Sequence, residues 1–230
     1  MRRVVAVVAV LLILVGAEVA VRIVATHRLT SAATCALAKQ QHGAVHGSVS
    51  GFPLTYRLLT GQGIPHVEVQ TTASGSAVDV TLDDVRFRHG LAARRADVDV
   101  RVPWAAMRRQ LPAEITEQYG DDLELGADGD LLAADLSVLG ATVRLNYAVS
   151  TAGGSIVLEP TKAVVGGLEV PVDVVRTMTG GVFADALATR RIKPELPLSA
   201  TLETARVTAA GLRLRLTLGA DALSRFDHCI

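Results

Sequence analysis

The side chains that could carry out catalysis lack the spacing that known catalytic sites need. Residues 47–51 read Gly-Ser-Val-Ser-Gly, which looks like the turn that presents a nucleophilic serine. The required order Gly-x-Ser-x-Gly, however, places Val49 at the nucleophile position. The histidines at 66, 89 and 228 have no serine, cysteine or aspartate at a recognisable spacing. No nucleophile, base and orienting group can be named, so we expect that the protein is not an enzyme.

Candidate metal ligands fail in the same way. His42 and His46 have the four-residue spacing of two zinc ligands on one helix face, but no glutamate follows His42, and the nearby glycines disfavour a helix. Residues 128–130, Asp-Gly-Asp, lack the twelve-position loop with a terminal glutamate that binds calcium. We predict a solvated loop at the two histidines, a surface turn at residues 128–130, and neither a metal nor another cofactor.

The composition excludes one class of partner and describes the core. Lysine plus arginine and aspartate plus glutamate both number 23, so the net charge of zero gives nucleic acid no electrostatic footprint. Hydrophobic residues make up 50% of the chain but aromatic residues only 3%. The interior must therefore be built mainly from valine, leucine and alanine, which predicts smooth aliphatic surfaces.

The N-terminus is typical of an exported protein. Two arginines follow Met1, and Val4 to Ala17 carry no charge, as in a secretory signal. As a helix this stretch would span roughly 21 Å, short of the hydrocarbon core of about 30 Å. Residues 15–17 are small enough for cleavage, yet the apolar pattern continues past Glu18. Residues 1–17 are thus predicted to be a signal peptide or the start of an uncleaved membrane anchor.

Beyond the leader, the sequence predicts one helix and then a single domain. Residues 18–40 contain neither glycine nor proline and are expected to continue the leader as a helix. Residues 41–230 show no fixed repeat and no long linker, so we expect one domain. Its apolar residues mostly alternate with polar ones, which indicates antiparallel strands with one dry face. The alternating positions include Val67, Val69, Val78, Val80, Leu82, Val98, Val100, Val102, Val143, Leu145, Tyr147, Val149, Leu212, Leu214, Leu216 and Leu218.

Only two further helices are expected in this domain. Pro103 is suited to open a short helix through Trp104, Met107 and Leu111. Residues 172–188 have helical spacing, with a kink expected at their glycine pair. Many long strands and few helices predict an α+β fold in which a strongly curved antiparallel sheet wraps around helix.

Cys35 and Cys229 lie near the two ends of the predicted exported chain. An even number of cysteines in an oxidising compartment favours a disulfide between them. The chain-entropy model gives at most about 5 kcal/mol for closing so long a loop. The alternative is a pair of unpaired buried thiols.

Several segments together resemble a known family. They are Val49-Ser50-Gly51-Phe52-Pro53-Leu54, then Leu58, Leu59, Gly61 and Val67-Glu68-Val69, and towards the end Leu196-Pro197-Leu198 and Gly211-Leu212. In these residues the chain resembles the LmeA-like phospholipid-binding proteins of the actinobacterial envelope, over most of the mature chain. The resemblance implies a fold akin to the tubular lipid-binding proteins, an exported location and phospholipid binding.

The candidate lipid-binding residues follow from the aliphatic faces. Phe52 and Leu54 lie beside Gly51 and Pro53, which suits the lip of a groove, although both side chains could instead fill the core. Trp104 could lie at a boundary between water and lipid, or simply attach its helix to the sheet. The predicted groove residues are Phe52, Leu54, Val67, Val69, Val80, Val98, Val100, Trp104, Leu214 and Leu216.

These observations favour an exported envelope protein that binds phospholipid in an aliphatic groove and shuttles it or supports envelope lipid assembly. Its expected place is the extracytoplasmic face of the cytoplasmic membrane or a periplasm-like space, with membrane phospholipid and the membrane surface as partners. The alternative is a non-enzymatic structural or interaction protein with a closed core. Nothing in the sequence identifies a protein partner or the lipid.

Overall fold

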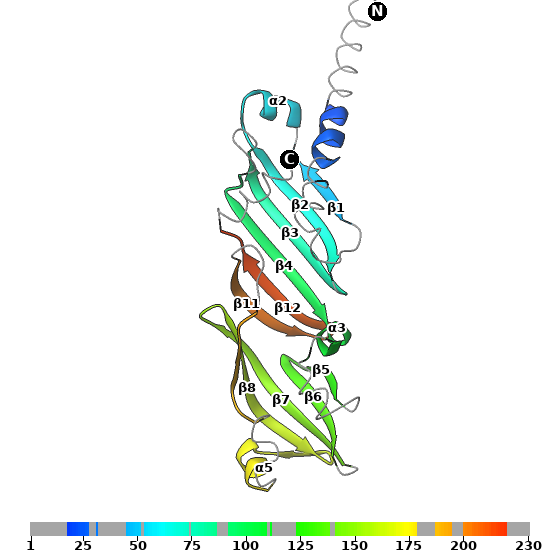
Figure 1. The fold of residues 1–230 in the computed structure, drawn as a ribbon, viewed down its shortest axis with the longest axis vertical. Helices are drawn as coiled ribbons and strands as arrows, with labels where there is room; N and C mark the ends of the chain where they lie inside the picture. Colours follow the sequence, from blue (N-terminus) through cyan, green and yellow to red (C-terminus); the bar gives the residue numbers. More distant parts are fainter. Residues whose placement is uncertain are drawn as a thin grey trace, which may run out of the picture. The chain divides into compact units, whose positions relative to one another are not determined.

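The computed structural model consists mainly of antiparallel strands joined by short turns (Figure 1). It describes residues 18–27, 31, 45–51, 53–73, 75–86, 92–109, 111, 123–138, 141–178, 187–194 and 200–219. The strands are β1 (His46–Ser50), β2 (Ile64–Ala73), β3 (Ser76–Val85), β4 (Arg95–Pro103), β5 (Glu124–Asp128), β6 (Leu131–Val138), β7 (Ala141–Ala152), β8 (Ser155–Val165), β9 (Leu168–Val170), β10 (Arg190–Ile192), β11 (Thr201–Thr208) and β12 (Gly211–Thr217). The helices are residues 18–27, α2 (Leu54–Leu59), α3 (Trp104–Arg109) and α5 (Val172–Met178).

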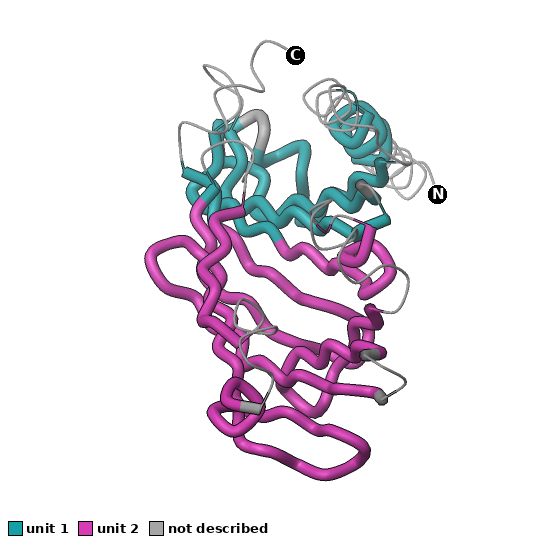
Figure 2. The backbone as a smooth tube through the Cα atoms, turned by 60° about the horizontal axis from the view of Figure 1, so that its bottom comes forward, with its two compact units in different colours: residues 1–98, 198–200, 217–230 teal, residues 99–197, 201–216 magenta. Residues whose placement is uncertain are grey.

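The strands form two sheets. One has the strand order β1-β2-β3-β4-β12-β11, and the other has the order β10-β8-β7-β6-β5, with β9 paired to β8. By backbone proximity the chain also divides into two compact units, drawn in teal and magenta in Figure 2. Unit 1 contains Met1–Val98, Leu198–Ala200 and Thr217–Ile230, and unit 2 contains Asp99–Pro197 and Thr201–Leu216. The predicted division into residues 1–17, 18–40 and 41–230 stays a prediction.

Unit 1 is built on the hairpin of β2 and β3, with β1 added at its edge. The register pairs Val49 with Val67 and Val69 with Val80, so valines of neighbouring strands stack on one face. Successive residues of a strand point to opposite sides, so Val67, Val69, Val80 and Leu82 share this face. The buried members of the core of unit 1 are Leu54, Ile64, Val67, Val69, Leu82, Val85 and Ala96, and Val21 of helix 18–27 packs against them.

Unit 2 contains the meander from β5 to β8, in which each strand pairs antiparallel with the next. The register of β7 and β8 shifts between Asn146 and Tyr147, where β8 carries one extra residue. One face of the meander holds a second aliphatic core, against which α3 and α5 pack through Met107 and Val175. The short helices therefore cover part of this face.

The predicted strands and the two later helices are confirmed within the described residues. The antiparallel sheets and the few helices agree with the expected fold class, whereas wrapping of the sheet around a helix stays a prediction. Helix 18–40 is described only for residues 18–27 and 31, and both are helical. The solvated loop predicted at His46 is wrong, because this residue begins β1. The sequence did not indicate β1, because its five residues, with glycine at the second position, show too little alternation of apolar and polar side chains.

Candidate lipid-binding surfaces

In unit 1 the predicted groove residues occupy one aliphatic cluster but differ in burial. Val67 and Val69 on β2 are buried, and their neighbour Val80 on β3 is only partly buried. Leu54, at the start of α2, has no exposed surface and belongs to the same core. Its burial fits the alternative that this leucine fills the core. Phe52 lies outside the described residues.

The backbone geometry of the turn before α2 explains why glycine occupies position 51. Gly51 has a φ of +122°, a conformation that side chains rarely adopt, and a β-carbon added there would lie 2.6 Å from Cγ of Pro65. The turn ends at Pro53, whose carbonyl accepts a hydrogen bond from the amide of Arg57. This stretch, on which the family resemblance rests, therefore serves to direct the chain into α2.

Glu18 fixes the start of the same helix. Its carboxylate accepts hydrogen bonds from the amides of Leu54 at 2.7 Å and Thr55 at 2.9 Å, and from the Thr55 hydroxyl at 2.9 Å. These two amides belong to the first turn, where amides have no partner within the helix. The backbone hydrogen bonds from Thr55 and Leu54 lower the pKa of Glu18 from 4.5 to about 2. The carboxylate thus stays ionised although its side chain is buried.

In unit 2, the predicted residues of β4 and β12 include two that are incompletely buried. Arg213 Nε donates to Asp99 Oδ2 at 2.8 Å, so these two side chains share one face of the strands. Val100 and Leu214 follow them directly in sequence and therefore share the opposite face. Both are half-buried, whereas Leu216, two residues further along β12, is buried. Val98 on β4, which belongs to unit 1, is also buried.

Trp104 begins α3, and its side chain makes one hydrogen bond and one set of apolar contacts. Its indole Nε1 donates to the carbonyl of Ala209 at 3.1 Å, and the partly buried ring packs against the core of unit 2. These contacts fit the alternative that Trp104 attaches its helix to the strands. No described contact requires a lipid boundary there.

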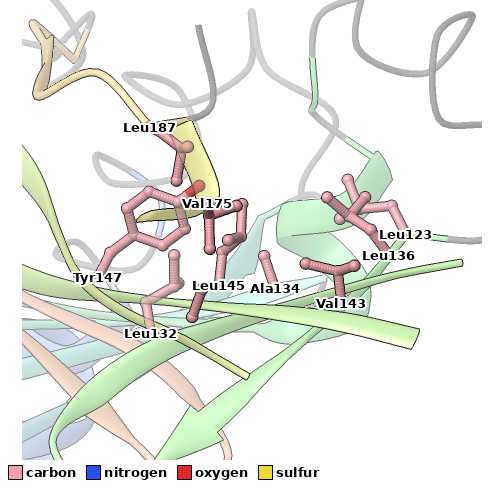
Figure 3. Close-up of a cluster of buried hydrophobic side chains, with 10 residues drawn as sticks. Leu123, Leu132, Ala134, Leu136, Val143, Leu145, Tyr147, Val175 and Leu187 are labelled. Atoms are coloured by element: carbon pink, nitrogen blue, oxygen red, sulfur yellow. The ribbon is translucent and has the colours of Figure 1, made fainter. Parts of the chain in front are cut away.

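The core of unit 2 is an aliphatic surface that the sequence did not single out as a candidate site. Figure 3 shows Leu132, Leu145 and Val143 on the strands, with Val175 near Leu145 and with Leu187 near Tyr147. Tyr147 contributes the one aromatic ring among the ten buried members of this cluster. The alternation on β7 and the helical spacing of residues 172–188 were the sequence signals for this cluster, and neither pattern separates a core from a ligand surface.

Polar groups in unit 1 align across three strands without forming a catalytic triad. The register places Ser50, His66 and Asp83 side by side on β1, β2 and β3. His66 Nδ1 lies 2.9 Å from Asp83 Oδ1, but its Nε2 lies 3.1 Å from Glu68 Oε1. The Ser50 hydroxyl donates instead to the backbone carbonyl of His66. The ring therefore has no contact through which it would activate the serine.

The two carboxylates give His66 a second property. Their hydrogen bonds, first that of Asp83 and then that of Glu68, raise its pKa above the usual 6.5. Both ring nitrogens can donate only when the imidazole is protonated. The arrangement consequently favours a positively charged His66.

The predicted turn at residues 128–130 is present: Asp128 ends β5, and Gly129, with a φ of +66°, and Asp130 connect it to β6. The Asp128 carboxylate accepts a hydrogen bond from the Asn146 amide nitrogen at 2.8 Å and lies 3.6 Å from Lys162 Nζ. Its oxygens thus contact β7 and β8. Among the described residues, no group of three or more histidine, cysteine or acidic side chains could hold a metal ion.

A comparison with protein families identifies the family of the chain. The family model described as LmeA-like phospholipid-binding matches residues 16–217. The chain belongs to this LmeA-like family. Its name describes binding of phospholipid and not catalysis. No curated protein and no solved structure matched the chain.

The LmeA-like match begins before Glu18 and ends with Thr217. It therefore includes helix 18–27, the turn at Gly51, and the strand that Gly211 opens. Within the part of the chain that the structure describes, no helix is long and apolar enough to cross a membrane.

Proposed function

We propose that this LmeA-like protein is exported to the cell envelope and binds phospholipid there through half-buried aliphatic residues of its strands. Membership of a phospholipid-binding family carries the proposal. Val80, Val100 and Leu214 are the best candidates among the predicted residues, because each leaves part of an apolar side chain uncovered. Val67, Val69 and Leu216 are already buried and are therefore assigned to the cores of their units.

Acyl chains are suited to such residues because aliphatic side chains offer contact without a fixed geometry. Each methylene group removed from water contributes about 0.8 kcal/mol, so contact with half-buried valines and leucines favours binding of a lipid tail. The protein would then carry or present the lipid without changing it chemically. In unit 1, both nitrogens of the His66 ring lie against carboxylates and not against Ser50.

The direct test is to purify the full chain from membranes with mild detergent and to analyse it by native mass spectrometry and lipid extraction. We expect phospholipid to co-purify in a defined ratio. Absence of bound lipid, together with failure to take up phospholipid from vesicles, would favour the alternative of a structural protein with a closed core.

Three substitutions separate a ligand surface from a core. Val100→Phe should reduce the lipid-to-protein ratio severalfold at nearly unchanged stability, because a bound lipid and not another side chain occupies the space beyond Val100. Val67→Phe should lower the free energy of unfolding by about 1–3 kcal/mol, because that site is filled. Leu168→Phe, at an exposed residue of β9, is the matched control and should change neither quantity. Loss of stability in Val100→Phe with unchanged lipid content would contradict the assignment.

A further inference from the structure

Helix 18–27 has two distinct sides. Val19, Ile23 and Val24 are 51%, 65% and 54% exposed, and their spacing places them on one face of the helix. Val21 on the other side packs against the core of unit 1, and Glu18 is buried beside it. A helix that belongs to a folded unit thus shows an apolar face to its surroundings.

The charged residues of this helix are both engaged by the protein. Glu18 binds the first amides of α2, and Arg22 Nη2 donates to the carbonyl of Gly51 at 2.9 Å. In the sequence these are the only charged residues between Val4 and Thr26. The side chains of Glu18 and Arg22, which interrupt the apolar segment, therefore both contact unit 1. The exposed face carries aliphatic side chains without a charge.

We propose that this exposed face, made of Val19, Ala20, Ile23 and Val24, docks on a phospholipid bilayer. It continues the uncharged segment from Val4 to Ala17, whose chemistry suits the same apolar environment. Glu18 and Arg22 attach the helix to unit 1 through the start of α2 and through Gly51. Docking of the helix would therefore hold unit 1 at the membrane surface. The inference rests on the proposed membrane association, and it adds which residues meet the lipid.

The test places a fluorescent reporter on the proposed face. Trp104 is the only tryptophan, so Trp104→Phe gives a dark background into which Ile23→Trp is introduced. The full chain is reconstituted into vesicles of phosphatidylcholine and phosphatidylglycerol, with and without brominated acyl chains. Leu168→Trp, at an apolar residue that is 73% exposed in unit 2, provides the matched control.

We expect brominated lipid to quench the tryptophan at position 23 strongly and that at position 168 weakly. Equal quenching at the two positions would overturn the proposal, as would crosslinking of position 23 to a second copy of the chain in place of lipid. If Trp104→Phe lowers the denaturation temperature, the extra quenching caused by Ile23→Trp is measured with Trp104 retained. Lipid co-purification is scored on the same samples, so failure of lipid binding and failure of docking are separate results.

Discussion

The structural role of Glu18 differs from the role that its position in the sequence suggests. As a sequence position it interrupts an apolar segment and divides a leader from the helix after it. In the structure its carboxylate caps α2, whose first amide lies 36 residues further along the chain. The interruption was predictable, but the partner was not, because sequence spacing carries no information about a contact between a helix and a distant turn.

The low pKa of Glu18 predicts acid sensitivity of unit 1. Because the carboxyl pKa is lowered from 4.5 to about 2, its stabilisation is present above pH 4.5 and is lost as the pH falls towards 2. Glu18→Gln keeps the shape but removes the charge, so its denaturation temperature should be lower at pH 6 and depend less on pH between 4.5 and 2. Thermal unfolding by circular dichroism measures both. Glu159→Gln, at an exposed residue of β8, should behave like the parent.

His66 should have the opposite effect on the pH dependence of stability, because its contribution is lost as the pH rises. Its raised pKa means that the pairing with Asp83 and Glu68 stabilises the fold below pH 6.5, and this contribution is lost as the pH rises through the pKa of the folded state. The residue is partly exposed, so we expect a small effect that salt weakens.

The corresponding measurement compares thermal unfolding at pH 6 and pH 8. The parent should lose more stability between these values than His66→Gln. His46→Gln, at an exposed histidine of β1, is the control and should keep the parental difference. An identical pH response in parent and His66→Gln would show that the ion pairs contribute nothing measurable.

At the level of elements, alternation predicted most of the long strands because each has one face on a core, but it did not single out β6. The segment of β12 is the clearest case, with leucines that alternate against arginines and a pair from Arg213 to Asp99 on the polar face. Helix α2 was missed, since six residues do not establish a helical period and its start depends on Glu18. The short β5 has glycine and alanine at its centre and gave no alternating signal.

Gly211 shows why β12 begins where it does. Its φ is +154°, and an added β-carbon would lie 2.0 Å from the carbonyl oxygen of Val102 on β4. Gly211→Ala should therefore strain or separate these strands and lower the free energy of unfolding by at least about 1–3 kcal/mol. Gly219→Ala, beyond the other end of the strand, meets open space and should be nearly neutral. Urea unfolding of both variants measures the difference, and equal stabilities would contradict this steric explanation.

For the whole molecule, composition predicted aliphatic surfaces but not which of them are covered. Val67 and Val100 occupy equivalent places in alternating strands, yet one is fully buried and the other is half-buried. This difference comes from packing between elements far apart in the sequence. The candidate site could therefore be predicted as a set of strand faces. Which of its residues keep an exposed part of the side chain could be known only from the fold.

The last prediction concerns the two ends of the chain. Cys35 and Cys229 lie outside the described residues, so their pairing rests on the sequence and on the proposed export to an oxidising compartment. Protein isolated from the envelope should resist thiol alkylation and yield one disulfide-linked peptide pair. The same chain made without residues 1–17 in a reducing cytoplasm should be alkylated at both cysteines. Because the crosslink would shorten the unfolded chain across nearly its whole length, reduction should lower the denaturation temperature, by an amount equivalent to at most about 5 kcal/mol. Two alkylated thiols in the exported protein would exclude the disulfide and leave the alternative of unpaired cysteines.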